Sequence, residues 1–523
     1  MDSLFIKLAN MMGGQVNTDH LKLLTCVLST YPLALLFNVL PNPLMKHLLS
    51  IFYTCFVLII VLSSWLGFLH LTVTSLFTYF FMKYYHGKNG PWINFFIIMV
   101  SMSICHLDRQ FKGVKGDTTL DYSGALMVAV MKLSSYGFNI QDGREKNKSL
   151  IHPFHLRMQI NSYPSLISFF GWVFFFGGVL AGPTCDYMDY IRLITLPLIE
   201  TSPKTLTEKQ RQTKLSCWNP VKIVLLKVSI MIIGLVFIHP TFNFPAILSD
   251  QYNNYPFYKR FLFLQLTATL TRFRFYTVWL LTEGACMVTG LGFNGFDKDD
   301  QPKWDRVVVA NVNVEWAPNF KILIERWNSA ANRWLKHYVF MRLAPLPSSS
   351  GSKAKIGFKP VIVTYLISSL WHGFLPGYFL FFATSALLQY AGNLMRKILR
   401  PLTMTPDMKQ GLPFWKTAYD VVCIILTVSC INSCSSSFML LTWEATVIAF
   451  KSVYCYHLLV ALAGLVIWHT MGPTLMSIQK RRIAKFNNEQ QKDSSMEGDV
   501  DDNKIKGLAV SQKTVIQNDF KTE

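Results

Sequence analysis

Long apolar runs alternate with short polar segments from Leu21 to His469. A membrane-spanning helix needs about 20 mostly apolar residues, and by this measure the pattern predicts roughly ten to twelve spans. The runs that define them are Leu23 to Leu40, Leu48 to Met82, Trp92 to Cys105, Tyr122 to Tyr136, Pro164 to Ala181, Val221 to Ile238, Phe261 to Leu291, Pro360 to Tyr390, Phe414 to Leu441 and Trp443 to His469. The sequence therefore predicts an all-α polytopic membrane protein.

Four of these runs do not have the length of one simple crossing. Leu48 to Met82 is too long for a single span and predicts a tight helical hairpin, and Phe261 to Leu291 is also too long. Trp92 to Cys105 and Tyr122 to Tyr136 are short, which predicts tilted, broken or partly embedded helices.

Composition supports the membrane class. Of 523 residues, 51% are hydrophobic and 15% are charged, whereas soluble domains contain about 25% charged residues. The formal net charge of +20 is spread over short loops, which is typical of topogenic charge and not of nucleic-acid binding, although attraction to anionic lipid is an alternative. Ten cysteines occur singly, without C-x-x-C pairs or zinc spacing, so neither a disulfide framework nor a metal site is indicated.

The composition changes abruptly after Ile478. A basic stretch with Lys480, Arg481, Arg482 and Lys485 leads into a polar tail. Such a tail cannot bury enough apolar surface to fold, and its basic start favours the cytoplasmic side. The pattern predicts a membrane domain over 1–478 and a disordered, cytoplasmic tail over 479–523.

An amphipathic segment stands out in the centre of the chain. Placed on one helix, Phe320 to Tyr338 gathers its large apolar side chains on one stripe, with charged residues opposite. Asn328 lies at the edge of that stripe, beside Trp327. This pattern alone leaves two interpretations of Asn328 open: an ordinary amide at a helix edge, or a functional group lining a water-filled chamber.

A lone histidine follows in the sequence Leu370-Trp371-His372-Gly373-Phe374. An ionisable side chain within an apolar span is costly and marks a functional site by default. Pro376-Gly377 weakens the helix just after it, and broken helices at membrane depth occur where they line a cavity or are buried in protein. The alternative is a core histidine bonded to a backbone carbonyl.

A buried histidine and an amide suit acyl transfer to a hydroxyl. The imidazole can take the proton of a hydroxyl as its oxygen attacks a carbonyl, and the amide can orient the reacting groups. Neither the G-x-S-x-G elbow nor a phosphate-binding G-x-x-x-x-G-K-[ST] loop occurs, nor does His followed five places later by Asp.

Four blocks of sequence resemble the membrane-bound O-acyltransferase (MBOAT) family, and within it the lysophospholipid acyltransferase branch. The blocks are Pro164-Ser165-Leu166 through Leu180-Ala181-Gly182-Pro183 to Asp189-Tyr190; Gly290 through Gly295; Trp327-Asn328 with Trp334-Leu335; and Trp371-His372-Gly373-Phe374 with Pro376-Gly377-Tyr378. The chain departs from the family pattern at Ala331, where Thr is usual, and at Leu375, where an aromatic residue is frequent.

The resemblance implies a bundle of about eleven transmembrane helices around a tunnel that contains the active site. His372 is then the general base and Asn328 the second catalytic residue. The resemblance further implies acyl-CoA as a co-substrate from the cytosolic side, no permanently bound cofactor, a lysophospholipid that arrives from the bilayer, and location in the endoplasmic reticulum.

Candidate substrate contacts surround these two residues. Arg333, Lys336 and Arg342 are expected to bind the phosphates of CoA, because charge-assisted bonds to phosphate are strong, although topogenic charge explains them equally well. Four aromatic residues are expected to line the substrate path; they are Trp327, Trp334, Trp371 and Tyr378. Two alternatives remain: acylation of a sterol, diacylglycerol or protein hydroxyl, and lipid transport or scrambling without chemistry.

Overall fold

The computed structural model describes residues 2–11, 18–113, 122–195, 216–344 and 358–518, with no side-chain description over 491–518. These residues form helices and connecting loops, and within them the only extended pairings are two isolated bridges. The all-α prediction is confirmed.

The first half of the chain contains α1 to α9, and α6 is buried along most of its length. The α-helices are α1 (Asp2–Met11), α2 (Thr18–Val39), α3 (Pro43–Cys55), α4 (Trp65–Tyr84), α5 (Gly90–Phe111), α6 (Ser123–Arg144), α7 (Pro153–Met158), α8 (Leu166–Val173) and α9 (Tyr187–Thr195). Most side chains of α6 are buried, and α6 packs against α4 and α5. A helix that is buried all round belongs to the interior of a large protein.

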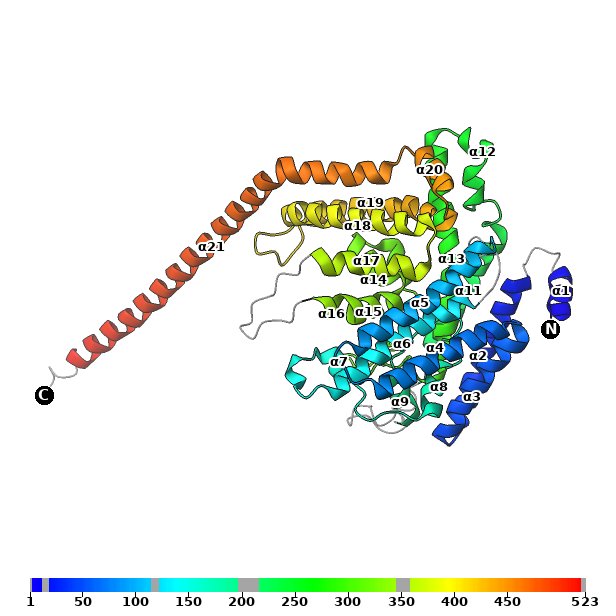
Figure 1. Cartoon of the computed structure of the whole chain (residues 1–523). Coiled ribbons are helices and arrows are strands. Elements are labelled where there is room, and N and C mark those ends of the chain that lie inside the picture. Colours follow the sequence, from blue (N-terminus) through cyan, green and yellow to red (C-terminus); the bar gives the residue numbers. More distant parts are fainter. Residues whose placement is uncertain (1, 12–17, 114–121, 196–215, 345–357, 519–523) are drawn as a thin grey trace.

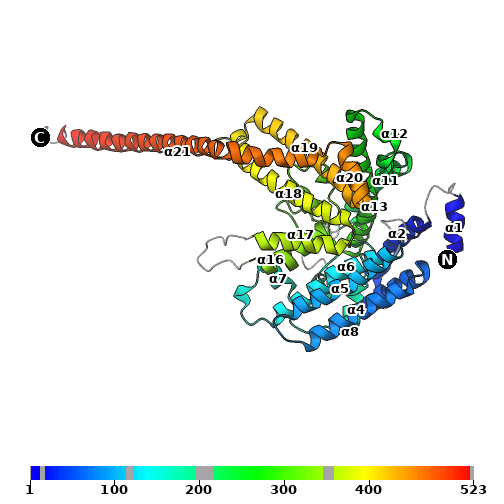
Figure 2. The ribbon, with the colours of Figure 1, turned by 45° about the horizontal axis from the view of Figure 1, so that its top comes forward.

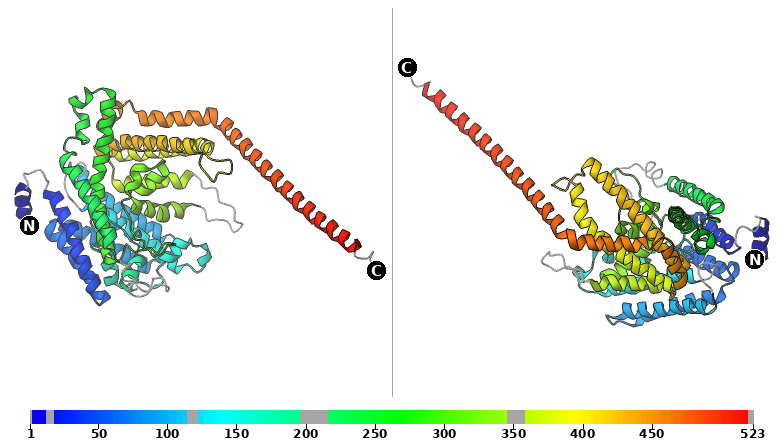
Figure 3. Two further views of the ribbon diagram at one scale, coloured as in Figure 1. Left: turned by 180° about the vertical axis from the view of Figure 1, so that it is seen from behind. Right: turned by 90° about the horizontal axis from the view of Figure 1, so that it is seen from above.

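The second half supplies a long helix and a stack of helices beside it. The α-helices are α11 (Trp218–Phe237), α12 (Asp250–Asn253), α13 (Phe257–Thr289), α14 (Phe320–Trp327), α15 (Ser329–Leu335), α16 (Met341–Leu343), α17 (Phe358–His372), α18 (Pro376–Leu399), α19 (Pro413–Leu440), α20 (Trp443–Ser452) and α21 (Tyr456–Asn518). Figure 1 and the left view of Figure 3 show α13 running across the direction of α17, α18 and α19. Because α13 contacts α2, α11 and α19, it joins the two halves of the bundle.

Among the described residues, seven helices have the length and apolar composition to cross a membrane. They are Thr18–Val39, Pro43–Val61, Trp65–Tyr84, Gly90–Phe111, Trp218–Phe237, Pro413–Leu440 and Tyr456–Gln490. Helices α6, α13 and α18 are also long, at 22, 33 and 24 residues, but are not among these seven. The multi-pass membrane architecture is confirmed, and a total of about eleven spans stays a prediction.

The lengths of several helices differ from the sequence-based expectations. Helices α5 and α6 are each 22 residues long and continuous. The prediction of broken helices there is wrong, while tilted or partly embedded helices stay a prediction. The run from Leu48 to Met82 is divided, as its length required, between α3 with a π-helical turn at Phe56–Val61 and α4. Helix α13 is one rod of 33 residues, about 50 Å at 1.5 Å per residue, so it is too long for one simple crossing, as predicted.

The last helix, α21, begins on the bundle, bends, and then extends away from it (Figures 1 and 2). Its first part packs on α18 and α19, and Gln479 and Arg482 donate hydrogen bonds to the carbonyls of Ile398 and Met404. Both donor residues belong to the predicted tail 479–523, which is helical as far as Asn518. Residues 519–523 lie outside the described residues. The boundary at 478 therefore stays a prediction.

Candidate active site

Asn328 lies at a break between two short helices. Helix α14 ends at Trp327 and α15 begins at Ser329, while Asn328 has the non-helical backbone angles φ −119° and ψ 82°. Its side-chain Oδ1 accepts a hydrogen bond from the backbone N–H of Ala331 at 3.0 Å. Asparagine is among the residues preferred at a helix N-terminus for this bond. The prediction of one continuous helix from Phe320 to Tyr338 is therefore wrong.

The cap also explains how the chain holds Asn328 without the threonine that is usual at position 331. The interaction uses the backbone N–H of Ala331 and needs no side-chain hydroxyl. With Oδ1 bonded, the amide nitrogen Nδ2 is turned to the other side, and none of the described residues accepts a hydrogen bond from it. The cap therefore fixes the direction of a free N–H donor.

His372 is the last residue of α17, directly before a turn. Gly373 has φ +127°, a conformation that residues with a side chain rarely adopt, and α18 begins at Pro376. The predicted break after His372 is confirmed, so the expected span Pro360 to Tyr390 is two helices. The turn is fastened to the end of α19, because the N–H of Gly377 donates to the carbonyl of Leu441 at 2.8 Å.

We expect Gly377→Ala to destabilise this turn. A Cβ atom at Gly377 would lie 2.1 Å from the carbonyl oxygen of Ser437, and overpacking against backbone typically costs about 1–3 kcal/mol. Thermal unfolding of the purified protein in detergent checks this. The matched control is Gly472→Ala, whose Cβ would make an ordinary 3.5 Å contact. Equal melting temperatures for both variants would contradict the prediction.

Aromatic rings surround the imidazole of His372. Ring centroids lie at 4.7 Å for Trp371, 4.9 Å for Phe438, 5.4 Å for Phe382 and 5.8 Å for Tyr378. The ring is half-buried, and among the described residues no hydrogen bond engages either of its nitrogens. His372 is therefore not a core histidine bonded to a backbone carbonyl. The neighbouring His106 does have such a contact, because its Nε2 lies 3.1 Å from the carbonyl oxygen of Trp371.

Asn328 and His372 line the same cavity. It has a volume of about 200 Å³, and its wall is built mainly by α13, α14, α15, α17, α18 and α19. Most of the wall is apolar and aromatic, including Trp327 and Trp371, which were expected to line the substrate path. A concave, largely apolar site with a few polar groups is typical of a small-molecule site.

The other candidate contacts lie outside this wall. Tyr378 touches the ring of His372 without lining the cavity, and Trp334 is buried, with its Nε1 donating to Ser134 Oγ at 2.8 Å. Arg342 pairs with both carboxylate oxygens of Asp142, at 2.8 and 2.6 Å. Lys336 is exposed to the outside of the structure. Binding of substrate by these residues stays a prediction.

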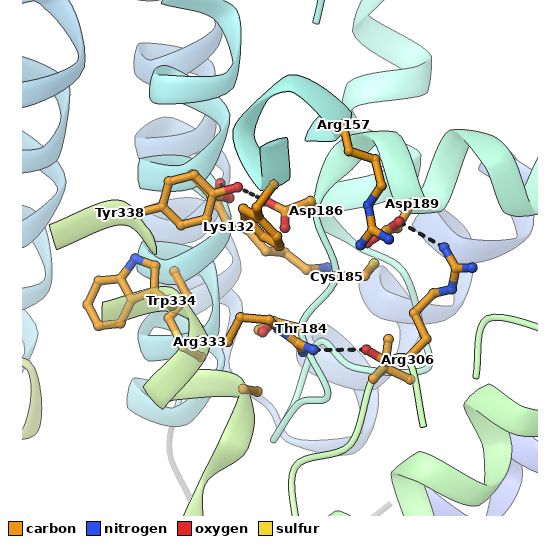
Figure 4. A pocket seen from close by; sticks show the side chains of 15 residues that line it. Lys132, Arg157, Thr184, Cys185, Asp186, Asp189, Arg306, Arg333, Trp334 and Tyr338 are labelled. Atoms are coloured by element: carbon orange, nitrogen blue, oxygen red, sulfur yellow. Dashed lines mark hydrogen bonds and ion pairs between the residues drawn. The ribbon is translucent and has the colours of Figure 1, made fainter. Parts of the chain in front are cut away.

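Arg333 lines a second, smaller chamber on another side of α15 (Figure 4). This chamber measures about 40 Å³ and contains four cationic side chains and two carboxylates. Asp189 Oδ1 accepts from Arg306 Nη1 at 3.1 Å, Asp186 Oδ1 accepts from the Tyr338 hydroxyl at 2.5 Å, and Arg333 Nη1 donates to the carbonyl of Arg306 at 2.9 Å. Ala330 and Arg333 face this chamber, whereas Ala331 and Asn332 face the cavity. Helix α15 therefore separates the two spaces.

A largely buried ion pair in the cavity wall was not predicted from the sequence. Arg272 on α13 donates to Glu315, from Nε to Oε1 at 2.8 Å and from Nη2 to Oε2 at 2.5 Å. A signal existed, because an arginine inside the apolar run Phe261 to Leu291 is costly in a membrane and marks a functional position. Its partner is 43 positions away in the sequence, so the pair itself was not readable.

Known proteins are similar to this chain over most of its length. The sequence model of the family described as MBOAT, membrane-bound O-acyltransferase family, matches residues 109–437. The "Lysophospholipid acyltransferase" of Schizosaccharomyces pombe is 33% identical over 460 residues, covering 86% of each chain. The protein of the same name from Saccharomyces cerevisiae is 29% identical, covering 88% of this chain and 76% of its own. "Membrane-bound glycerophospholipid O-acyltransferase 1" of Mus musculus is 26% identical, covering 86% and 89%. The chain belongs to the membrane-bound O-acyltransferase family.

Proposed function

We propose that the protein transfers a fatty acyl group from acyl-CoA to the free hydroxyl of a lysophospholipid. The observation that supports this most is that Asn328 and His372 line one apolar cavity inside a membrane bundle. Relatives across most of the chain are named for acyl transfer to lysophospholipids or glycerophospholipids. The products are a diacyl phospholipid and free CoA.

His372 acts as the general base in this proposal. Its imidazole nitrogen takes the proton of the glycerol hydroxyl while that oxygen attacks the thioester carbonyl, without an acyl-enzyme. The tetrahedral intermediate then collapses, the C–S bond breaks, and the CoA sulfur receives the proton from the imidazolium. In this proposal the rings of Trp371, Phe382 and Phe438 limit the access of water to the imidazole, which favours transfer to the lipid over hydrolysis.

Asn328 positions the reacting groups. Because Oδ1 is held by Ala331, the Nδ2 donor is pre-organised and loses little freedom when it binds. It donates to the imidazole or to the reacting oxygen in the cavity.

The substrates arrive from different sides in this proposal. Acyl-CoA reaches the cavity from the cytosol, and the lysophospholipid moves in from the bilayer of the endoplasmic reticulum. The basic residues Lys480, Arg481, Arg482 and Lys485 favour a cytoplasmic C-terminal tail.

The direct test is transfer of labelled oleoyl from oleoyl-CoA to a panel of lysophospholipids in membranes that contain the protein. Product with at least one lysophospholipid supports the proposal. If no lysophospholipid is acylated while sterol, diacylglycerol or a protein substrate is, the acceptor class is wrong. Lipid movement without acyl-CoA, and no acylation of any acceptor, would instead indicate a transporter or scramblase.

We expect Lys336→Glu to weaken the use of acyl-CoA. Lys336 is exposed, and reversing one exposed charge near bound phosphates is worth at most about 1 kcal/mol, or about a fivefold rise in the KM for acyl-CoA. The rise should shrink at high ionic strength because exposed charges are screened. The matched control is Lys321→Glu, which reverses the charge of an exposed lysine on a different helix, α14. An unchanged KM for acyl-CoA in Lys336→Glu would count against the phosphate contact.

A further inference from the structure

The wall of the cavity contains one positive and one negative formal charge. Among the described lining residues, these are Arg272 on α13 and Glu315 in the short 3-10 helix Val312–Trp316. The guanidinium binds both oxygens of the carboxylate, at 2.8 and 2.5 Å. The wall is therefore neutral overall, with a strong local dipole where the two groups meet.

Each partner of the pair has hydrogen-bonding capacity left. A guanidinium has five N–H donors, and among the described residues Arg272 uses two on Glu315, one on Thr269 Oγ1 at 3.1 Å and one from Nη1 to Asn432 Oδ1. One N–H on Nη1 remains. A carboxylate accepts about four bonds, and Glu315 accepts two from Arg272 and one from the Tyr276 hydroxyl at 3.0 Å. The Arg272 side chain is 10% exposed and that of Glu315 is 22% exposed.

We infer that this pair is the head-group site and that it selects zwitterionic lysophospholipids, such as those with phosphoethanolamine or phosphocholine. The phosphate accepts from the remaining N–H of Arg272, and the ammonium group lies against Glu315. This inference rests on the proposed function and adds the class of acceptor to it.

Charge balance gives the selectivity. A zwitterionic head group brings one positive and one negative charge to a site with the opposite arrangement, so no net charge enters the cavity. An anionic head group brings a negative charge that Arg272, already paired with Glu315, does not compensate. An uncompensated charge in a low-dielectric cavity is strongly disfavoured, and this penalty rejects the wrong acceptor.

The spacing along α19 fits such an acceptor. Asn432 accepts from Arg272, and Phe438 lies with its ring 4.9 Å from that of His372. Phe438 follows Asn432 by six positions on the helix, a rise of about 9 Å. In a lysophospholipid, four bonds join the attacking oxygen to phosphorus and four more reach the ammonium nitrogen. With bonds of about 1.5 Å these distances are roughly 5 and 10 Å in an extended chain. A hydroxyl at His372 therefore brings the head group to the pair.

Competition between two acceptors tests the inference. Membranes with the wild-type protein receive oleoyl-CoA and equal amounts of lysophosphatidylethanolamine and lysophosphatidylglycerol with the same acyl chain. The product ratio reports the ratio of kcat/KM values and does not depend on the amount of active protein. We expect about a tenfold excess of phosphatidylethanolamine, which corresponds to roughly 1.4 kcal/mol. An equal ratio, or an excess of phosphatidylglycerol, would overturn the inference.

Two variants change the charge of the pair in opposite directions. Glu315→Gln keeps the shape but leaves Arg272 unpaired, so the ratio should fall to one or below. Asn432→Asp adds a carboxylate beside Arg272, so the ratio should rise. Glu444→Gln, which removes one exposed carboxylate that does not line the cavity, is the matched control. A wild-type ratio in Glu315→Gln, or an unchanged or lower ratio in Asn432→Asp, would overturn the inference.

The inference can still be tested if a variant is inactive. If Glu315→Gln makes neither product, Asn432→Asp decides, and if both are inactive, the wild-type ratio decides. If the wild-type protein acylates neither lysophospholipid nor any other in the panel, the proposed function itself fails. If it acylates both equally, only the selectivity inference fails.

Discussion

Replacing His372 with alanine is expected to lower kcat for acyl transfer by about 10²–10⁴-fold, the usual contribution of a general base. The protein should remain folded, because the described residues make no hydrogen bond to the imidazole and its contacts are those of aromatic rings. The measurement is initial rate with saturating oleoyl-CoA and lysophospholipid, at protein amounts matched by immunoblot.

His469→Ala is the control for this variant. His469 is exposed on α21 and does not line the cavity, so its removal should leave the rate unchanged. A wild-type rate in His372→Ala would make the histidine structural and remove the base from the mechanism. Equal losses in both variants would indicate a general effect of histidine removal on the preparation.

Asn328 is expected to show a separation of activity from stability. Asn328→Asp keeps an oxygen for the N–H of Ala331 but lacks the Nδ2 donor, so kcat should fall about 10²–10³-fold while the melting temperature stays close to that of the wild type. Asn328→Ala loses the donor and the cap together. It should lose the same activity and also about 1 kcal/mol of stability.

Asn332→Asp controls for the charge that Asn328→Asp introduces. Asn332 also lines the cavity, on the next turn of α15, and its side chain makes no hydrogen bond to a described residue. A negative charge there leaves the amide of Asn328 in place, so the loss should stay below about tenfold. If Asn332→Asp is as impaired as Asn328→Asp, added charge and not the lost donor explains the effect.

The sequence predicted the turn at His372 but not the break at Asn328. Proline and glycine directly mark the first, because Pro376 cannot continue α17 and Gly373 adopts φ +127°. At Asn328 the apolar stripe continues on both sides, so periodicity predicts one helix. The break depends on one hydrogen bond from the backbone N–H of Ala331 to the side chain of Asn328. The sequence does not distinguish an asparagine that caps a helix from one that lies within a helix.

Several residues close to Asn328 in the sequence, which were predicted to contact substrate, do not line the cavity. Successive helical residues point about 100° apart, so Arg333 faces the small chamber while Asn332 faces the cavity. The polar pair in the cavity wall comes instead from Arg272 and Glu315, which only the tertiary arrangement of α13 brings together. Local pattern predicted the fold class and the histidine, whereas the remaining wall depends on long-range packing.

The wall of the cavity has a consequence for the order in which the protein is made. Its residues extend along the chain from Phe244 to Met439, and α19 supplies the last of them. During synthesis, α13 and the Asn328 segment emerge before α19. Arg272 and Glu315 are therefore made before the part of the cavity wall that α19 contributes. The cavity can be complete only after α19 has left the ribosome and packed against α13. Any quality control that acts on the nascent chain meets these two charges before Asn432 is there to bind the guanidinium.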